Sequence, residues 1–193
     1  MFTFDPMIVG RTHFLFALLL FSSLLLGCGS DEIVQQKNTY YPWESYLTTE
    51  IAYVIKHGNR LQKSVILDGE KEEKVLPDVD WKKEWALFLE ADLNKAAYQT
   101  AYDHFSEPGM IWYSLKPGEN LSVKKFVLHL DAEERPVKVE IEVEQKNLLF
   151  ETHKKLFMNF SEGHVETYYI EGSQQMTWTK PTEYKLMGVL LPK

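Results

Sequence analysis

The chain has 193 residues and a formal net charge of −7 at pH 7, because 28 aspartates and glutamates outnumber 21 lysines and arginines. Its lysines are scattered or lie beside acids, which argues against nucleic acid and anionic headgroups as partners, since both select clustered positive charge. The single cysteine excludes a disulfide within the chain, and the length suffices for one domain with a hydrophobic core.

The first predicted element is a short apolar run near the N-terminus. Residues 14–26 read FLFALLLFSSLLL, carry no charge, and follow Arg11 and His13. A helix that crosses a bilayer needs about 20 apolar residues, so this run is short for a permanent anchor. Its length and its positive flank are typical of the hydrophobic region of a signal peptide, which is removed from the mature protein.

The apolar run ends in Leu25, Leu26, Gly27 and Cys28, the last of which is the one cysteine of the chain. This order of residues resembles the lipobox of bacterial lipoproteins. The resemblance covers these four positions and the run before them. It implies that residues 1–27 are a signal peptide and that Cys28 carries the lipid that anchors the mature protein to a membrane. The alternative is an ordinary secretory signal with a cysteine beside its cleavage site.

The residues after the cysteine bear on the location of the protein. Gly29 is not aspartate, so the resemblance implies that the inner-membrane retention signal is absent and that sorting to the outer membrane is favoured. Residues 30–32 (Ser-Asp-Glu) resemble acidic tethers that send some lipoproteins to the cell surface, so the periplasmic and the surface face both stay open. We expect a lipid-anchored protein of the cell envelope, with residues 28–42 as a flexible tether and residues 43–193 as a single domain.

Two amphipathic helices are predicted at the start of this domain. Apolar side chains recur at three- and four-residue spacing over about residues 44–66 and again over residues 81–96, which indicates two helices with one buried stripe each. Asp78 or Asp80 would cap the second helix. Between the two helices, residues 68–77 are charged and turn-rich and predict an exposed connection.

From Met110 almost to the end of the chain, the pattern changes to a period of two residues. The clearest strand covers residues 137–143, where valine and isoleucine alternate with lysine and glutamate. We therefore expect an α+β fold, with two N-terminal helices followed by a curved antiparallel β-meander of six or seven strands. Such a sheet can enclose an apolar cavity. A nearly closed barrel with the helices outside is the alternative.

Common catalytic motifs are absent from the sequence: it has no G-x-S-x-G, phosphate-binding glycine loop, H-E-x-x-H or EF-hand spacing. The histidines after the lipobox never form a close pair, so we expect no metal and no cofactor. Asp103, His104 and Glu107 could supply an acid-base set, and His129 and Asp131 lie on one strand face, but polar clusters of this kind are common. We expect no catalytic residues, and a hydrolase is the least favoured function.

The most unusual local composition is at residues 38–46 (NTYYPWESY). Tyr40, Tyr41, Trp43 and Tyr46 are candidate contacts to a ligand or partner, because aromatic rings with polar neighbours stack on sugars or insert into grooves. The alternative is that they pack against the start of the first helix. Three aromatic residues of the later strands allow the same two interpretations: Tyr168, Tyr169 and Trp178.

The location and the predicted architecture lead to two functional hypotheses. The first is a non-catalytic binding module for an apolar or glycan ligand, held near the membrane by the lipid on Cys28. The alternative is an accessory or scaffold subunit that docks on a protein complex of the envelope. An enclosed apolar cavity would favour the first hypothesis, and a filled core with an exposed aromatic patch would favour the second.

Overall fold

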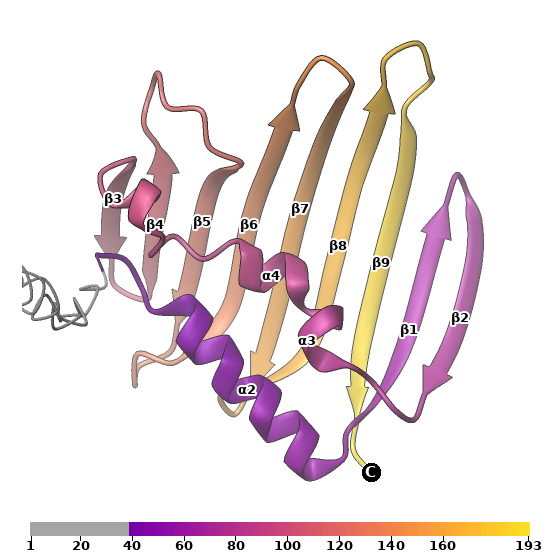
Figure 1. Cartoon of the computed structure of the whole chain (residues 1–193). Helices are drawn as coiled ribbons and strands as arrows, with labels where there is room; N and C mark the ends of the chain where they lie inside the picture. The colour runs from indigo at the N-terminus through magenta and orange to yellow at the C-terminus, as the bar shows by residue number, and fades with distance from the viewer. Residues whose placement is uncertain (1–38) are drawn as a thin grey trace, which may run out of the picture. The chain divides into compact units, whose positions relative to one another are not determined.

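The computed structural model describes residues 39–193, which belong to one compact unit. The predicted signal peptide and Cys28 lie outside the described residues. A nine-stranded antiparallel sheet makes up most of the unit, and a few short helices cover one of its faces (Figure 1). Within residues 39–193, no helix combines the length and the hydropathy that crossing a membrane requires.

The helices precede most of the strands, but the first hairpin comes between them. The elements up to this point are α2 (Trp43–His57), β1 (Arg60–Leu67), β2 (Glu70–Leu76), α3 (Trp81–Glu84), α4 (Ala86–Glu90) and the 3-10 turn η2 (Ala96–Tyr98). The remaining strands are β3 (Tyr102–Glu107), β4 (Met110–Leu115), β5 (Val123–Leu130), β6 (Pro136–Lys146), β7 (Phe150–Ser161), β8 (His164–Met176) and β9 (Thr182–Leu191).

The strand order is β2-β1-β9-β8-β7-β6-β5-β4-β3. Strands β3 to β9 form a meander, and the β1–β2 hairpin adds to the far side of β9, so the first and last strands lie side by side (Figure 1). The register of β1 on β9 runs from Arg60 opposite Leu191 to Leu67 opposite Tyr184. The prediction of an antiparallel sheet is thus confirmed.

Helix α2 begins and ends where elementary rules place its ends. Glu44 lies in the first turn and Lys56 in the last, where each charge type interacts favourably with the helix dipole. Gly58 adopts a left-handed conformation with φ of 64°, and its N–H donates to the carbonyl of Ile55 at 3.1 Å. This glycine cap ends the helix.

The predicted fold class was wrong. In place of two N-terminal helices followed by six or seven strands, the described residues form mostly one nine-stranded antiparallel sheet with few helices. The first helix was predicted to continue to residue 66, but after the Gly58 cap the apolar residues belong to β1. The second predicted helix is two short pieces, α3 and α4, which meet at Trp85.

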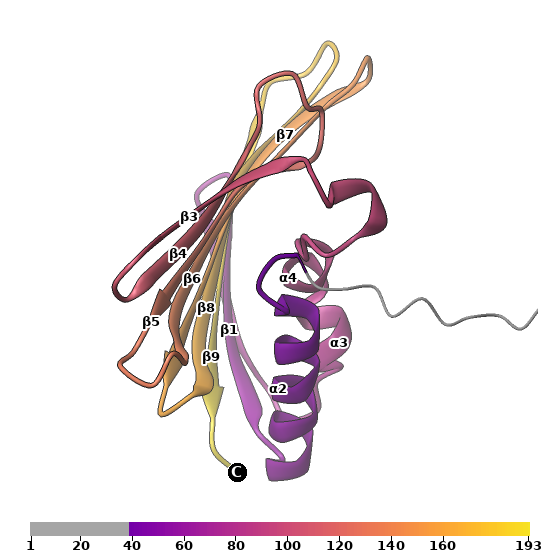
Figure 2. The same cartoon turned by 90° about the vertical axis from the view of Figure 1, so that its left-hand side faces the viewer.

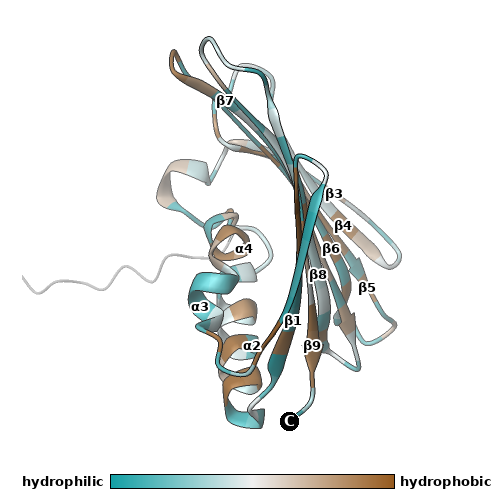
Figure 3. Ribbon diagram, turned by 90° about the vertical axis from the view of Figure 1, so that its right-hand side faces the viewer, coloured by the Kyte–Doolittle hydropathy of each residue, from teal (hydrophilic) through white to brown (hydrophobic). Residues whose placement is uncertain are grey.

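Two strands that the sequence did not predict, β2 and β3, are the two edge strands of the sheet. Residues 68–77 were predicted to be an exposed connection, yet they contain β2, whose side chains are almost all exposed. Its ribbon is mostly hydrophilic in colour at the edge of the sheet (Figure 3). An edge strand with charges on both faces has no apolar period to detect, and its pairing with β1 supplies its backbone hydrogen bonds instead. Strand β3, which precedes the strand pattern predicted from Met110 onward, is the edge strand on the other side of the sheet.

The helices pack on one face of the sheet, which we call the inner face (Figure 2). The buried residues of α2 recur at helical spacing and place Trp43 against Phe126 of β5, with ring centroids 5.6 Å apart. The Trp43 indole Nε1 donates to the carbonyl of Phe88 in α4 at 2.7 Å. Within residues 39–193, the buried apolar residues from Tyr40 to Leu190 form one cluster, so this segment contains a hydrophobic core of its own, which is the requirement for folding alone.

The inner face is also joined to α3 by partly buried polar contacts. The Tyr168 hydroxyl of β8 donates to Glu84 of α3, and the Nζ of Lys63 on β1 lies 2.7 Å from the same carboxylate. Burial raises the pKa of the Tyr168 phenol well above its ordinary value. The Tyr168 ring lies over Gly188 of β9, where an added Cβ would come within 2.0 Å of the ring. Glycine at this position therefore makes room for the tyrosine.

Candidate functional site

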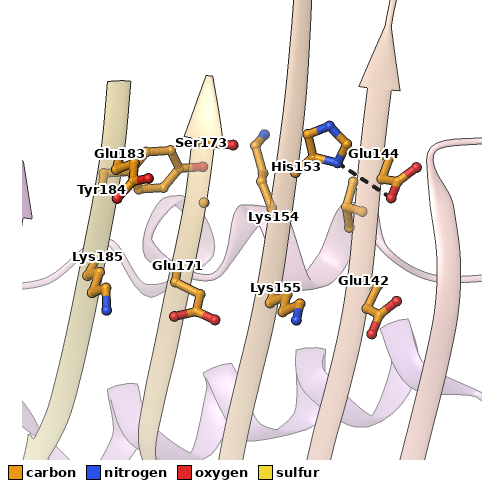
Figure 4. A pocket seen from close by; sticks show the side chains of 12 residues that line it. Glu142, Glu144, His153, Lys154, Lys155, Glu171, Ser173, Glu183, Tyr184 and Lys185 are labelled. Carbon is orange, nitrogen blue, oxygen red and sulfur yellow. Dashed lines mark ion pairs between the residues drawn. The ribbon is translucent and has the colours of Figure 1, made fainter. Parts of the chain in front are cut away.

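The opposite face of the sheet, which we call the outer face, is not covered by any of the described helices (Figure 2). Its side chains come from alternate positions of each strand, and the strand register arranges them in rows that cross the sheet. One row alternates in charge from strand to strand (Figure 4). We call it the charge row, and its members are Lys125, Glu142, Lys155, Glu171 and Lys185. Opposite charges on neighbouring strands stabilise a sheet, by about 0.2–1 kcal/mol per pair.

A shallow hollow of about 360 Å³ lies along the charge row, and charged side chains dominate its lining (Figure 4). Its upper border includes His153, whose Nε2 lies 3.0 Å from Glu151 and whose Nδ1 lies 3.4 Å from Glu144. Such a hollow is suited to polar groups, because an apolar ligand would have to displace water from these charges without replacing its hydrogen bonds. It differs from the apolar cavity that the sequence suggested.

The next row of the outer face is largely apolar. We call it the hydrophobic stripe, and its members are Phe105, Trp112, Val127, Phe157, Tyr169 and Met187, interrupted on β6 by Glu140. The rings of Phe105 and Trp112 stack with centroids 5.2 Å apart, and those of Phe157 and Tyr169 are 6.0 Å apart. Phe105 is 43% exposed and Met187 is 44% exposed. Trp112, Phe157 and Tyr169 are partly exposed, whereas Val127 is only 9% exposed. The stripe is therefore a partly solvent-accessible apolar band across seven strands.

The one carboxylate in the stripe is neutralised by its neighbours. The Nζ of Lys138 lies 2.9 Å from Glu140 Oε1, and the Nε2 of His129 lies 3.0 Å from the same atom. These partners, Lys138 above all, hold the pKa of the Glu140 carboxyl below its ordinary value. The Lys138 ammonium also lies 5.7 Å from the centroid of the Phe157 ring. The carboxylate that interrupts the stripe is therefore an ion-paired group.

The structure separates the four aromatic residues that the sequence singled out near the first helix. Tyr40 and Trp43 are core residues, and the Tyr40 hydroxyl donates to the carbonyl of Tyr98 at 2.9 Å. Tyr41 and Tyr46 are half-buried and line a hollow of about 260 Å³ beside α2. Burial raises the pKa of Tyr41 to about 12, so its phenol stays neutral at physiological pH.

The same hollow reaches a buried carboxylate that sequence reasoning missed. Glu50 accepts from the backbone N–H of Val165 at 3.3 Å and lies 3.2 Å from Nδ1 of His164, whose ring stacks on Tyr53. Glu50 occupies the apolar stripe of α2 together with Trp43, and an acid at such a position was the available signal. Because these contacts join α2 to β8, the pair has a clear structural role.

The other polar candidates are not brought together. Asp103, His104 and Glu107 are exposed on strand β3, where neighbouring side chains point to opposite faces. His129 pairs with Glu140, whereas Asp131 binds Arg135 through Oδ2 at 2.8 Å. Among residues 39–193, no three histidine, cysteine, aspartate or glutamate side chains are grouped closely enough to hold a metal ion.

Comparison of the chain with models of protein families, with curated proteins and with solved structures found no match.

Proposed function

We propose that the chain is a lipid-anchored, non-catalytic accessory subunit of the cell envelope that docks on a protein partner through the outer face of its sheet. The observation that carries the proposal is the hydrophobic stripe on that face, which the described helices leave uncovered while they fill the inner face. Exposed aromatic residues that gather in one patch are typical of protein interfaces.

The composition of the outer face is better suited to binding another protein than to binding a small ligand. The stripe supplies aromatic anchors of the kind that carry most of the binding energy at protein interfaces, including Trp112 and Tyr169. The charge row runs beside it, and such charges fix the register of a partner and exclude wrong ones. A stripe bordered by polar residues matches the apolar core and polar rim of an interface.

The alternative of a carrier for an apolar ligand has less support. The inner face, on which such a carrier would need its cavity, is filled by Trp43, Trp85 and Phe88, each with at most 1% of its surface exposed. The outer hollow of about 360 Å³ is lined mainly by charged side chains, and the hollow beside α2 ends at the Glu50 carboxylate. A partner protein, in contrast, requires no enclosed cavity.

The anchor in this proposal is a lipid on Cys28, inferred from the lipobox, with the outer membrane as the favoured location because Gly29 is not aspartate. Replacing Cys28 by serine should weaken the association of the full-length protein with the membrane fraction after cell lysis, because the product carries no acyl chains. Metabolic labelling with a fatty acid should mark the wild type alone. A labelled Cys28→Ser protein would contradict the anchor.

The docking surface is tested by co-purification of the full-length protein from detergent-solubilised membranes of its own host. The double variant Phe105→Ser/Phe157→Ser should reduce the amount of co-purified partner by about tenfold or more, because both rings belong to the hydrophobic stripe. The matched control is Ile55→Ser, which removes a 60% exposed apolar side chain from α2. Equal amounts of partner with the double variant and the wild type would refute the docking face.

A further inference from the structure

Two neighbouring turns at one end of the sheet expose an unusual amount of apolar surface. They connect β6 to β7 and β8 to β9, and they lie next to each other because β7 and β8 pair as far as Phe150 opposite Met176 (Figure 1). Four of their side chains are strongly exposed and form what we call the apolar tip: Leu148 (94% exposed), Leu149 (70%), Met176 (55%) and Trp178 (98%). Single exposed apolar residues are ordinary, but four on two adjoining turns are not.

Hydrogen bonds hold the two turns together. The backbone N–H of Thr177 donates to the carbonyl of Leu149 at 2.9 Å, and the Thr177 hydroxyl donates to the carbonyl of Leu148 at 2.8 Å. Within the first turn, Asn147 Oδ1 accepts from the N–H groups of Leu149 and Phe150. The apolar tip is therefore a structured projection that joins both hairpins.

The backbone of the second turn is unfavourable for the residue that it carries. Trp178 has φ of 76°, in the left-handed region where glycine or asparagine is usual and a bulky side chain is an outlier. The turn thus holds a large aromatic ring in solvent at a position where a small residue would fit with less strain. Strain of this kind at an exposed site is a reason to look for a binding role.

The two turns of the tip contain lysines and no acidic residue. Within residues 145–150 and 174–182, the charged residues are Lys146 and Lys180, although the whole chain has a net charge of −7. The Lys146 ammonium lies 2.7 Å from the carboxylate of Glu151, which follows the first turn on β7. A tryptophan with leucines, flanked by lysines, is the combination that favours the boundary between lipid headgroups and acyl chains. A protein interface needs no such cationic flank around its apolar centre.

We propose that the apolar tip inserts into the headgroup region of a lipid membrane. This surface is distinct from the outer-face stripe and adds a second membrane contact to the lipid on Cys28, whose identity as an anchor belongs to the proposed function. The eleven peptide links from Cys28 to Thr39 can span about 40 Å when extended, and β7 with its 12 residues is about as long. The tether is therefore long enough for the tip to reach the same membrane.

The test uses residues 38–193, which lack Cys28, so its outcome does not depend on the lipid anchor. This domain should co-sediment with vesicles of phosphatidylcholine and phosphatidylglycerol at physiological salt, where screening confines electrostatic effects to about 8 Å. The double variant Leu148→Ser/Leu149→Ser should have a vesicle affinity at least about tenfold lower than that of the wild type, because two leucine side chains no longer enter the lipid. Ile55→Ser, with a 60% exposed side chain on α2, should bind like the wild type.

A second readout places the tip in the bilayer. Vesicles that contain brominated acyl chains should quench part of the tryptophan fluorescence of the wild-type domain, and Trp178→Phe should remove most of that quenching. Trp43, Trp81 and Trp85 are buried, and Trp112 lies in the outer-face row of Phe157, seven residues along β7 from Phe150 beside the tip. Circular dichroism should show that all variants are folded. The proposal would be overturned if the wild type did not bind the vesicles, if the leucine variant bound equally well, or if Ile55→Ser lowered binding to the same extent. Loss of a co-purified protein by the leucine variant, without vesicle binding by the wild type, would assign the tip to a protein partner instead.

Discussion

The same strands form the inner and outer faces of the sheet, but the described helices cover only the inner face. On β7, Leu156 and Met158 have no exposed surface and pack against the helices, whereas Lys155 and Phe157 point to the other side. On the inner face, large apolar residues are matched by tryptophans and phenylalanine from α2, α3 and α4. On the outer face, an apolar row of comparable width has no such cover among the described elements. We propose that a partner protein covers this row, because a contiguous exposed apolar row is typical of interaction sites.

The comparison predicts opposite responses to removal of one aromatic ring from each face. Phe88→Ala should lower the free energy of unfolding by about 3–5 kcal/mol, because Phe88 is 0% exposed and its loss leaves a cavity in the core. Phe105→Ala, at a 43% exposed position of the outer face, should change it by less than about 1 kcal/mol. Urea unfolding of residues 38–193 measures both. Similar losses for the two variants would mean that the outer face is part of the structural core.

A smaller effect concerns the carboxylate within the outer stripe. The pKa of Glu140 is lowered in the folded protein, so its contribution to stability is complete above the ordinary glutamate pKa of about 4.3 and is lost as the pH falls below it. The wild type should therefore be more stable than Glu140→Gln at pH 7, by less than about 1 kcal/mol, since the group is partly exposed. The difference should vanish in acid. A difference that grew as the pH fell would reverse the assigned direction.

Part of this architecture could be predicted from the sequence. The alternation at residues 137–143 identifies β6 and its buried face, because a half-buried strand needs period two. The first helix was also predicted, but it was predicted to end at residue 66 and not at His57. Gly58 alone does not reveal that residues 60–67 form a strand that pairs with β9, near the other end of the sequence. Pairing over such a separation leaves no local pattern.

The candidate site could be predicted only in its residue types. The alternation assigns Lys155 and Glu171 to solvent, but their place in one charge row depends on the registers of β7 and β8, which include a bulge near Asn159 and Phe160. Likewise, Gly188 gives no sign in the sequence that it accommodates the ring of Tyr168 on the neighbouring strand. The sequence therefore predicted which residues are exposed but not which of them lie together, because that depends on the cross-strand register of the whole sheet.

The most direct test of the docking surface is photocrosslinking in intact cells from single positions of the full-length protein. A photoreactive amino acid in place of Phe157 or Tyr169, both on the outer stripe, should give one discrete adduct with another envelope protein. The same amino acid in place of Ile55, an exposed residue on α2, should not give this adduct. Absence of an adduct at both stripe positions, an equal adduct at Ile55, or an adduct with a second copy of this chain alone would contradict the accessory-subunit account.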